Sequence, residues 1–229
     1  MFVINPLPDP LHPDLVNLLE RVETATVGHV LHSGFVDPDV RAVLPERRVA
    51  GTAVTLRIPG PDSTLLHHVL GLVRPGDFLV IDRAGDRRHA CWGGVVTNAA
   101  KAAGVVGGLI DGPATDFSEI RRCDMPLWCR GPSPITTKLL SLEGALNVPV
   151  TVGGQTISPG DAILADESGV LVLDRTHAEA IARRAIEMQE REITLLERIH
   201  QGERLGDISG ASRMVEETNQ RSSPHQARG

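Results

Sequence analysis

The sequence contains no tyrosine, and aromatic residues make up only 3% of its 229 positions. Proteins that bind single-stranded nucleic acids stack the bases on aromatic side chains, so such a platform is not expected here. Basic residues are also outnumbered, with 23 lysines and arginines against 29 aspartates and glutamates and a formal net charge of −6. Surfaces that bind nucleic acids or anionic membranes show a basic excess, so we expect neither as a partner.

Long apolar runs and paired cysteines are missing too. The most apolar stretch, from Cys91 to Ile110, is interrupted by Asn98 and Lys101 and so falls short of the roughly 18 residues that a membrane span needs. The three cysteines are odd in number and lack the spacing of a metal knuckle: Cys91, Cys123 and Cys129. For Cys91 and Cys129 we favour buried structural thiols over nucleophiles. Because the N-terminus has no basic leader, we expect a cytoplasmic protein.

Hydrophobic periodicity predicts a mixed α/β fold with a largely β centre. Residues 13–22 place leucine and valine at helical spacing, whereas residues 49–58 alternate β-branched side chains in the manner of a strand. A strand over 78–82, a helix over about 94–103 and a strand over 105–111 form a predicted β-α-β unit.

The rest of the chain predicts short strands and then one long helix over residues 177–201. The polar sequence beyond it cannot bury enough apolar surface to form a core. We therefore expect a single domain over residues 1–206 and a flexible C-terminal tail over residues 207–229.

A glycine pair marks the first candidate for ligand binding. Gly93 and Gly94 precede a predicted helix, so the amides of Gly94, Val95 and Val96 lie at its positive end, where a carboxylate or phosphate binds without a special side chain. The alternative is that the glycines only allow a strand and a helix to pack closely, which is the commoner role of such a pair.

The second candidate is Asp116, which follows the predicted strand over residues 105–111. Ligands of open α/β sheets gather at such strand ends, and a carboxylate there can hold Mg²⁺ or another hard divalent cation. The alternative, favoured by position alone, is that Asp116 caps the helix that follows it, with Glu119 completing a capping box.

Other polar residues give weaker signals. His29 and His32 lie three residues apart, as two ligands on one helix face do, but no third ligand follows, so we favour a polar helix face. The three arginines of residues 83–88 form either a solvated loop, which we favour, or an anion clamp: Arg83, Arg87 and Arg88. No nucleophile elbow, zinc-protease, Walker A or Rossmann motif is present.

Four segments carry a family resemblance: PGDFLVID, WGGVVTNAAKAAGVVGGLIDGPATDFSEI, MPLWCRGPSP and VPVTVGGQTISPGDAILADESGVLVL. In this order they resemble the 4-hydroxy-4-methyl-2-oxoglutarate aldolase family. That family also includes the regulator of ribonuclease activity A and proteins mislabelled as demethylmenaquinone methyltransferases. The resemblance extends from about Thr24 to Leu205, and the number and order of the segments make it specific.

The resemblance implies a swivelling β/β/α-type α/β domain, with a central β core flanked by helices and a C-terminal helix. It also implies a homotrimer or a dimer of trimers, with sites between the subunits. The family's aldolases are similar to class II enzymes, in which a divalent metal, Mg²⁺ or Mn²⁺, stabilises the enolate formed when a carbon–carbon bond of a 2-oxo acid breaks. The same site decarboxylates oxaloacetate through the same enolate.

Active members of the family carry an acidic residue, twenty intervening residues and then Arg-Asp. The matching positions here are Gly94, Thr115 and Asp116, so only the aspartate that resembles the metal ligand is retained. His67 matches the family's substrate-side histidine, and Glu192 matches a glutamate that reaches a neighbouring subunit's metal. An exposed helix charge is an equal alternative for Glu192.

Losing a charge-assisted contact to a carboxylate weakens binding about tenfold to a hundredfold. The arginine absent at Thr115 could be replaced only by another cation that the fold brings inward. The sequence offers four candidates for that role: Arg83, Arg87, Arg88 and Arg130.

The sequence therefore predicts a divalent-metal-dependent lyase that acts on a small oxo acid by aldol cleavage or decarboxylation. Asp116 and His67 are the predicted catalytic residues, Asp116 and Glu192 the metal ligands. The predicted substrate-binding residues are Gly93, Gly94, Val95, Val96 and Thr115. Two alternatives stay open: another metal-dependent enzyme with an altered substrate, such as a lactone or a hydroxy acid, and a non-catalytic ring that regulates a protein partner.

Overall fold

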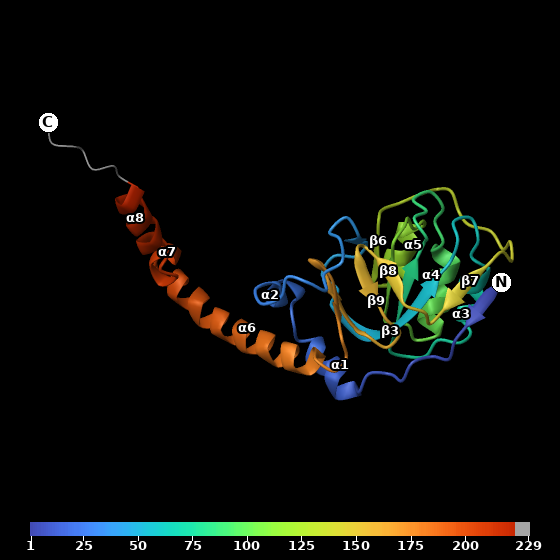
Figure 1. Ribbon diagram of the computed structural model, residues 1–229, viewed down its shortest axis with the longest axis horizontal. Coiled ribbons are helices and arrows are strands. Elements are labelled where there is room, and N and C mark those ends of the chain that lie inside the picture. The colour runs from blue at the N-terminus through green and yellow to red at the C-terminus, as the bar shows by residue number, and fades with distance from the viewer. Residues whose placement is uncertain (223–229) are drawn as a thin grey trace. The chain divides into compact units, whose positions relative to one another are not determined.

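The computed structural model describes residues 1–222 and divides the chain into two compact units, with the boundary between Ala185 and Ile186. The first unit is built on a mixed β-sheet (Figure 1). Its main path runs β1 (Phe2–Ile4), β7 (Gly144–Leu146), β3 (Val49–Arg57), β4 (Asp77–Asp82), β5 (Gly107–Ile110), β6 (Leu127–Cys129) and β2 (Arg41–Ala42).

Two further strand pairs complete the β structure of this unit. Strand β10 (Ala162–Asp166) pairs antiparallel with β3 and with β11 (Gly169–Leu173). Strands β8 (Val150–Val152) and β9 (Gln155–Ile157) form a separate antiparallel hairpin.

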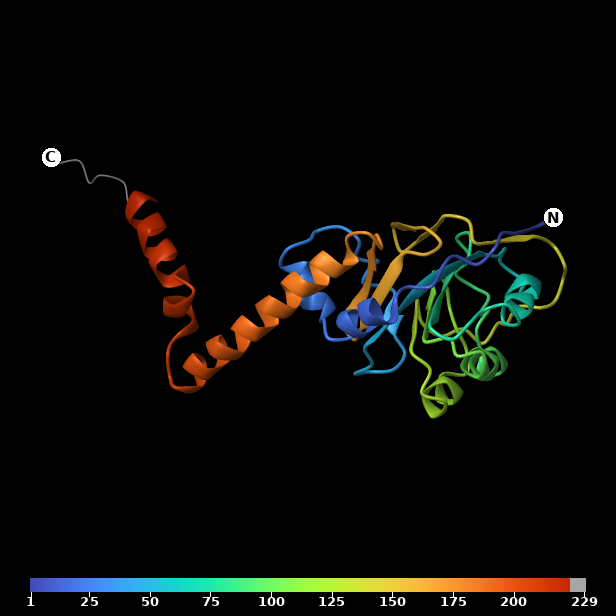
Figure 2. The same ribbon diagram turned by 90° about the horizontal axis from the view of Figure 1, so that it is seen from below.

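Three short helices cover one face of the sheet, and the β8–β9 hairpin lies over the other, as Figures 1 and 2 show. The helices are α3 (Thr64–Val69), α4 (Gly94–Ala102) and α5 (Phe117–Arg122). Two more, α1 (Pro13–Leu19) and α2 (Thr24–Gly28), precede the sheet's long strand β3 in the chain.

Strand β4 illustrates how the sequence fills both faces. Phe78 and Val80 belong to the core beneath the β8–β9 hairpin, whereas Leu79 and Ile81 belong to the core beneath the helices. Since successive side chains of a strand point to opposite faces, this alternation requires apolar residues throughout, and all four are fully buried.

The predicted β-α-β unit is confirmed. Strands β4 and β5 are parallel, with Phe78 opposite Gly107 and Ile81 opposite Ile110, and α4 connects them. Because parallel strands end at the same edge of a sheet, the segments that follow β4 and β5 start side by side. These segments lead to Gly93 and to Asp116.

The C-terminal region differs from the sequence prediction. The first compact unit ends at Ala185, within α6 (Ala178–His200), earlier than the domain end expected at residue 206. Two helices, α7 (Leu205–Ile208) and α8 (Ala211–Ser222), lie where a flexible tail was expected, and residues 223–229 lie outside the described part of the chain. The Arg213–Glu217 ion pair, 3.7 Å long and one turn apart, is a local contact of α8.

None of the helices within residues 1–222 is both long and apolar enough to cross a membrane.

Candidate active site

A pocket of about 260 Å³ brings together most of the predicted site residues. Its lining includes His67 from α3, the start of α4 and the segment that leads into α5. The predicted residues that line it are His67, Gly93, Gly94, Val95, Val96, Thr115 and Asp116. Residues that are 49 positions apart in the sequence therefore share one small cavity.

The carboxylate of Asp116 caps α4. The Gly94 amide, at the first position of that helix, donates a hydrogen bond of 2.9 Å to Asp116 Oδ2. Asp116 itself has left-handed backbone angles, with φ at 53°, a conformation that non-glycine residues rarely adopt. Such strain persists where the surrounding structure enforces it and is frequent at functional sites.

The capping-box alternative for Asp116 is wrong. Asp116 occupies the N-cap position of α5, but its side chain makes no hydrogen bond to that helix. Glu119 does not reach back either, because it accepts hydrogen bonds from Asn98 and Arg122 instead. The carboxylate of Asp116 is thus directed to the neighbouring helix α4.

The structure supports the close-packing interpretation of the glycine pair, whereas the binding of an external anion stays a prediction. A Cβ on Gly93 would lie 2.7 Å from Asp116 Oδ2 and 2.9 Å from Thr115 Cγ2, so the glycine allows these two side chains to approach closely. The Gly94 amide does bind an anionic group, but that group is the carboxylate of Asp116 in the same chain. The amides of Val95 and Val96 belong to the first turn, where a helix leaves N–H groups without internal partners. They lie at the positive end of α4.

Main-chain bonds hold the Thr115 side of the pocket. The Thr115 amide donates to the Trp92 carbonyl at 2.8 Å, and the indole of Trp92 donates to Thr97 Oγ1 at 3.0 Å. Trp92 is fully buried, so the segment before α4 and the segment before α5 are joined by a rigid contact.

A family model described as RraA-like (Aldolase/RraA) matches residues 22–172, a range that includes every residue of this pocket. The chain belongs to the RraA-like family. The family and the fold class predicted from the sequence are both confirmed.

Individual relatives agree with this assignment. A protein of Halalkalibacterium halodurans, provisionally named 4-hydroxy-4-methyl-2-oxoglutarate aldolase, is 32% identical over 142 residues, or 62% of this chain and 67% of that protein. RraAS2 of Streptomyces coelicolor, described as an unusual member of the RNase ES inhibitor RraA family, has a similar structure, with a TM-score of 0.73 and 29% identity. That match covers 82% of this chain and 99% of RraAS2.

A solved structure without an assigned activity is similar over more of the chain. It is an uncharacterised protein of Pseudomonas syringae with a TM-score of 0.75 and 26% identity. The match covers 92% of this chain and 98% of that protein, so the two structures share the mixed α/β architecture.

The donor set of this RraA-like pocket fits a hard divalent cation rather than zinc. Asp116 is the only carboxylate that lines it among the described residues, and no group of three or more His, Cys, Asp and Glu side chains that could hold a metal occurs within residues 1–222. Zinc requires three or four such ligands, whereas Mg²⁺ keeps several waters and binds through one or two carboxylates. Asp116 could hold Mg²⁺ or Mn²⁺ with water and substrate oxygens completing the coordination.

Glu119 lies next to position 94, where active members of the family carry an acidic residue. A Cβ on Gly94 would lie 3.0 Å from Glu119 Cγ, so the glycine leaves room for this glutamate. Hydrogen bonds from Arg122 and Asn98 lower the pKa of Glu119 to about 2, which keeps it ionised. The chain thus retains a carboxylate beside α4, contributed by α5 and paired with Arg122.

Glu192 lies in the part of α6 that belongs to the second unit, where it is exposed. Its expected role at a neighbouring subunit's metal stays a prediction. His67 is exposed at the pocket, whereas its neighbour His68 is not part of the lining.

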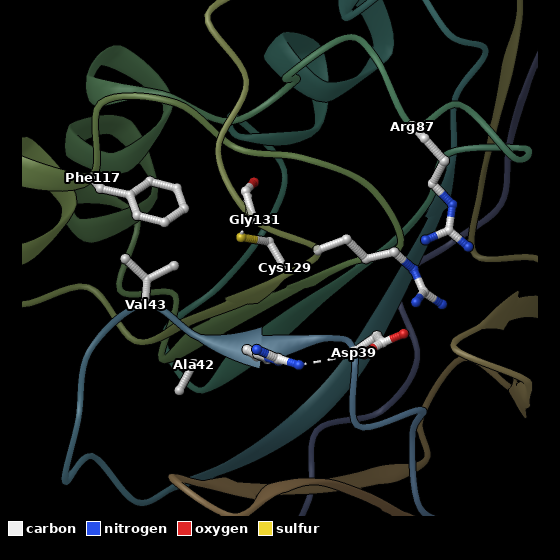
Figure 3. Close-up of a pocket in the computed structure, with 9 residues that line it drawn as sticks. Asp39, Ala42, Val43, Arg87, Phe117, Cys129 and Gly131 are labelled. Atoms are coloured by element: carbon white, nitrogen blue, oxygen red, sulfur yellow. Dashed lines mark hydrogen bonds and ion pairs between the residues drawn. The ribbon is translucent and has the colours of Figure 1, made fainter.

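None of the arginines considered as a replacement for the family's clamp lines this pocket. Arg83 is fully buried rather than solvated, and it donates to the carbonyl of Gly60. Arg88 is exposed. Arg87 and Arg130 line a second pocket of about 450 Å³, into which Arg87 points in Figure 3.

The guanidinium groups of that second pocket are already paired. Arg130 donates to Asp111 and to Asp37, the latter at 3.0 Å, and Arg87 lies 3.7 Å from Asp111. Arg41 lies 3.5 Å from Asp39, the contact drawn as a dashed line in Figure 3. Arg130 therefore joins segments that are distant in the sequence, whereas Arg87 and Arg41 make more exposed contacts.

The structural interpretation of two cysteines is supported. Cys91 and Cys129 are buried, and burial raises the pKa of the Cys91 thiol to about 11, so a reactive thiolate is disfavoured.

Sequence reasoning missed Lys138, which lines the Asp116 pocket. It lies outside any helix or named strand, and no motif marks it. The only available signal is its rarity, since the chain contains just two lysines, Lys101 and Lys138.

Proposed function

We propose that the protein is a divalent-metal-dependent lyase that cleaves a carbon–carbon bond of a small oxo acid by aldol cleavage or decarboxylation. The observation that carries the proposal is the convergence of Asp116, His67 and the first turn of α4 in one small pocket. Relatives named as aldolases support the same reaction class. A cavity of about 260 Å³ suits a small acid, because drug-sized ligands occupy roughly 300–1,000 Å³.

Each residue has a distinct task in this proposal. Asp116 holds the cation, with its carboxylate fixed by the Gly94 amide. A bound divalent cation supplies Lewis-acid stabilisation of the negative charge that develops on the substrate's keto oxygen. The amides of Val95 and Val96 accept a substrate carboxylate at the positive end of α4, and His67 orients the substrate.

The assembly belongs to the proposal as well. We propose a homotrimer or a dimer of trimers, in which Glu192 of one subunit approaches the metal held by another. The second unit's exposed apolar residues, Ile193 and Leu196, are consistent with contacts between copies.

A regulatory role is the second candidate. The similarity over 99% of RraAS2, which is described as a member of an RNase ES inhibitor family, supports a role in which the chain binds another protein. Thr115, in place of an arginine, supports a third reading in which the same metal site acts on a different substrate.

A coupled pyruvate-release assay on oxaloacetate, with and without Mn²⁺, tests the proposal. The informative variant is Asp116→Asn, which keeps an oxygen acceptor for the Gly94 amide but removes the charge. We expect Mn²⁺-dependent turnover in the wild type and its loss in Asp116→Asn. Asp14→Asn serves as the control, because that side chain is 88% exposed on α1.

Absence of pyruvate release in the wild type, from oxaloacetate and from a panel of 4-hydroxy-2-oxo acids, would contradict the lyase proposal. Capture of a protein partner that is unchanged by Asp116→Asn would favour the regulatory ring.

A further inference from the structure

Lys138 differs from the other charged residues near Asp116, because it lines the same pocket and has no partner of opposite charge within residues 1–222. The chain has two lysines, and Lys101 on α4 donates to the Asp124 carbonyl at 3.3 Å. Lys138 lines the pocket and makes no ion pair within the described part of the chain. Among the described lining residues it is the one side chain with a permanent positive charge, and Asp116 is the one with a negative charge.

The main chain holds Lys138 in a defined place. Its amide donates to the Pro61 carbonyl at 2.8 Å, and its carbonyl accepts from the Ser63 amide at 3.0 Å. On the other side of the segment, the Thr137 amide donates to the Ala90 carbonyl at 3.2 Å. The backbone that carries the Lys138 side chain is therefore hydrogen-bonded to the segment at Pro61 and Ser63 and to the segment at Ala90.

A buried carboxylate fixes the residues that follow. Asp62, only 1% exposed, accepts hydrogen bonds from the amides of Leu140 and Leu142 at 3.0 and 2.8 Å. It also accepts from the amide of Thr64 at 2.8 Å, at the start of α3, the helix that carries His67. One carboxylate thus positions both the Lys138 segment and the His67 helix.

We propose that Lys138 binds the carboxylate of the substrate, together with the free amides at the start of α4. This inference rests on the proposed function, since it assigns the group that recognises the acid at the same site. An ammonium and helix amides are complementary to a carboxylate, and Lys138 lines this pocket whereas none of the four arginines considered for the same task does.

Electrostatic binding is favoured over covalent chemistry for this lysine. Amines that form Schiff bases are activated by desolvation or by a second cation nearby. Lys138 is exposed, and no other lysine or arginine lines its pocket among the described residues.

The scarcity of lysine makes a direct test possible. Reductive methylation with ¹³C-formaldehyde labels the two lysines and the amino terminus of the full chain and retains their charge. Titration with pyruvate in the presence of Mg²⁺ is expected to shift the Lys138 methyl signal and leave the Lys101 signal unchanged. Each signal is assigned with the matching lysine-to-arginine variant.

Affinity measurements on variants provide the second readout. We expect Lys138→Met to weaken pyruvate binding about tenfold to a hundredfold, whereas Lys138→Arg retains most of the affinity. Lys101→Met, which removes the same charge outside the pocket, is expected to bind as the wild type does. Because Lys138 is exposed, its variants should fold, and circular dichroism checks this.

The outcomes separate this inference from the proposed function. Oxaloacetate turnover with equal pyruvate binding by wild type and Lys138→Met would overturn the role of Lys138 alone. Lys138-dependent binding without turnover would support that role and contradict the lyase proposal. A pyruvate adduct on Lys138 trapped by borohydride would overturn electrostatic binding, and absence of pyruvate binding in the wild type would overturn both.

Discussion

The amide of Gly94 donates a 2.9 Å hydrogen bond to the carboxylate of Asp116, which lies 22 positions later in the chain. This contact joins the first turn of α4 to the residue that precedes α5. It positions an acidic side chain at the positive end of a helix, where anions are stabilised. The candidate metal ligand therefore depends on the helix terminus for its orientation.

Gly93→Ala tests that dependence. The new Cβ would lie 2.7 Å from Asp116 Oδ2 and 2.9 Å from Thr115 Cγ2, so the carboxylate must move. We expect a destabilisation of about 1–3 kcal/mol in urea unfolding, with loss of Mn²⁺ binding. Gly71→Ala is the control, because the added Cβ would lie 3.5 Å from the His68 carbonyl oxygen, an ordinary van der Waals distance. Unchanged Mn²⁺ binding in Gly93→Ala would contradict the proposed geometry.

The buried carboxylate of Asp62 should stabilise the pocket in a pH-dependent way. Burial by itself raises the pKa of Asp62, but hydrogen bonds from Thr64, Leu140 and Leu142 outweigh it and lower the pKa from 3.8 to about 2. Because the pKa is lower in the folded state, the ionised group contributes stability above pH 3.8 that is lost as the pH falls through 2. We expect Asp62→Asn to lower the unfolding free energy by about 1–3 kcal/mol at pH 7.

The unfolding free energy of Asp62→Asn should approach that of the wild type as the pH falls from about 4 toward 2. Urea denaturation at several pH values measures this difference. Asp39→Asn serves as a comparison, because the Asp39 side chain is 73% exposed and its stability effect should be small. A deficit of the same size at pH 2 and pH 7 would argue that the amide disturbs packing instead.

Thr115→Arg should compensate for the loss of Lys138. The pocket lining includes both residues, so an arginine at position 115 restores a cation beside the proposed carboxylate site. We expect Lys138→Met/Thr115→Arg to bind pyruvate more tightly than Lys138→Met alone, by calorimetric titration. Additive effects of the two substitutions would indicate that they act on separate sites.

The cysteines should differ in reactivity. Alkylation requires the thiolate, and burial raises the pKa of both Cys91 and Cys129, to about 11 for Cys91. Cys123 is only half-buried. Iodoacetamide at pH 8 should therefore modify Cys123 first, and all three thiols should react in urea. Rapid labelling of Cys91 in the folded protein, detected by mass spectrometry, would contradict its burial.

Periodicity and strand ends predicted much of the fold and drew attention to the glycine pair and to Asp116, whereas His67 came only from the family resemblance. The alternation in β4 and the helical spacing of α4 are local, and they suffice to bring Gly94 and Asp116 to one edge of the sheet. The direction of the Asp116 carboxylate was not predictable, because the spacing to Glu119 equally suits a capping box within α5.

Long-range bonds explain what the sequence did not reveal. Lys138 reaches the pocket through main-chain bonds to Pro61 and Ser63, which leave no periodic pattern. Arg83 was expected in a solvated loop, yet it is buried against Gly60. The very short strands β1, β2 and β7 likewise depend on their partners rather than on their own residues.

Manganese binding at Asp116 tests the central claim most directly. Electron paramagnetic resonance of free Mn²⁺, titrated with the full chain in the presence of pyruvate, reports how much metal is bound. The account predicts binding by the wild type and by Asp14→Asn, and a loss of at least about tenfold in affinity for Asp116→Asn. Equal Mn²⁺ affinity in Asp116→Asn and the wild type would contradict the assignment of Asp116 as the metal ligand.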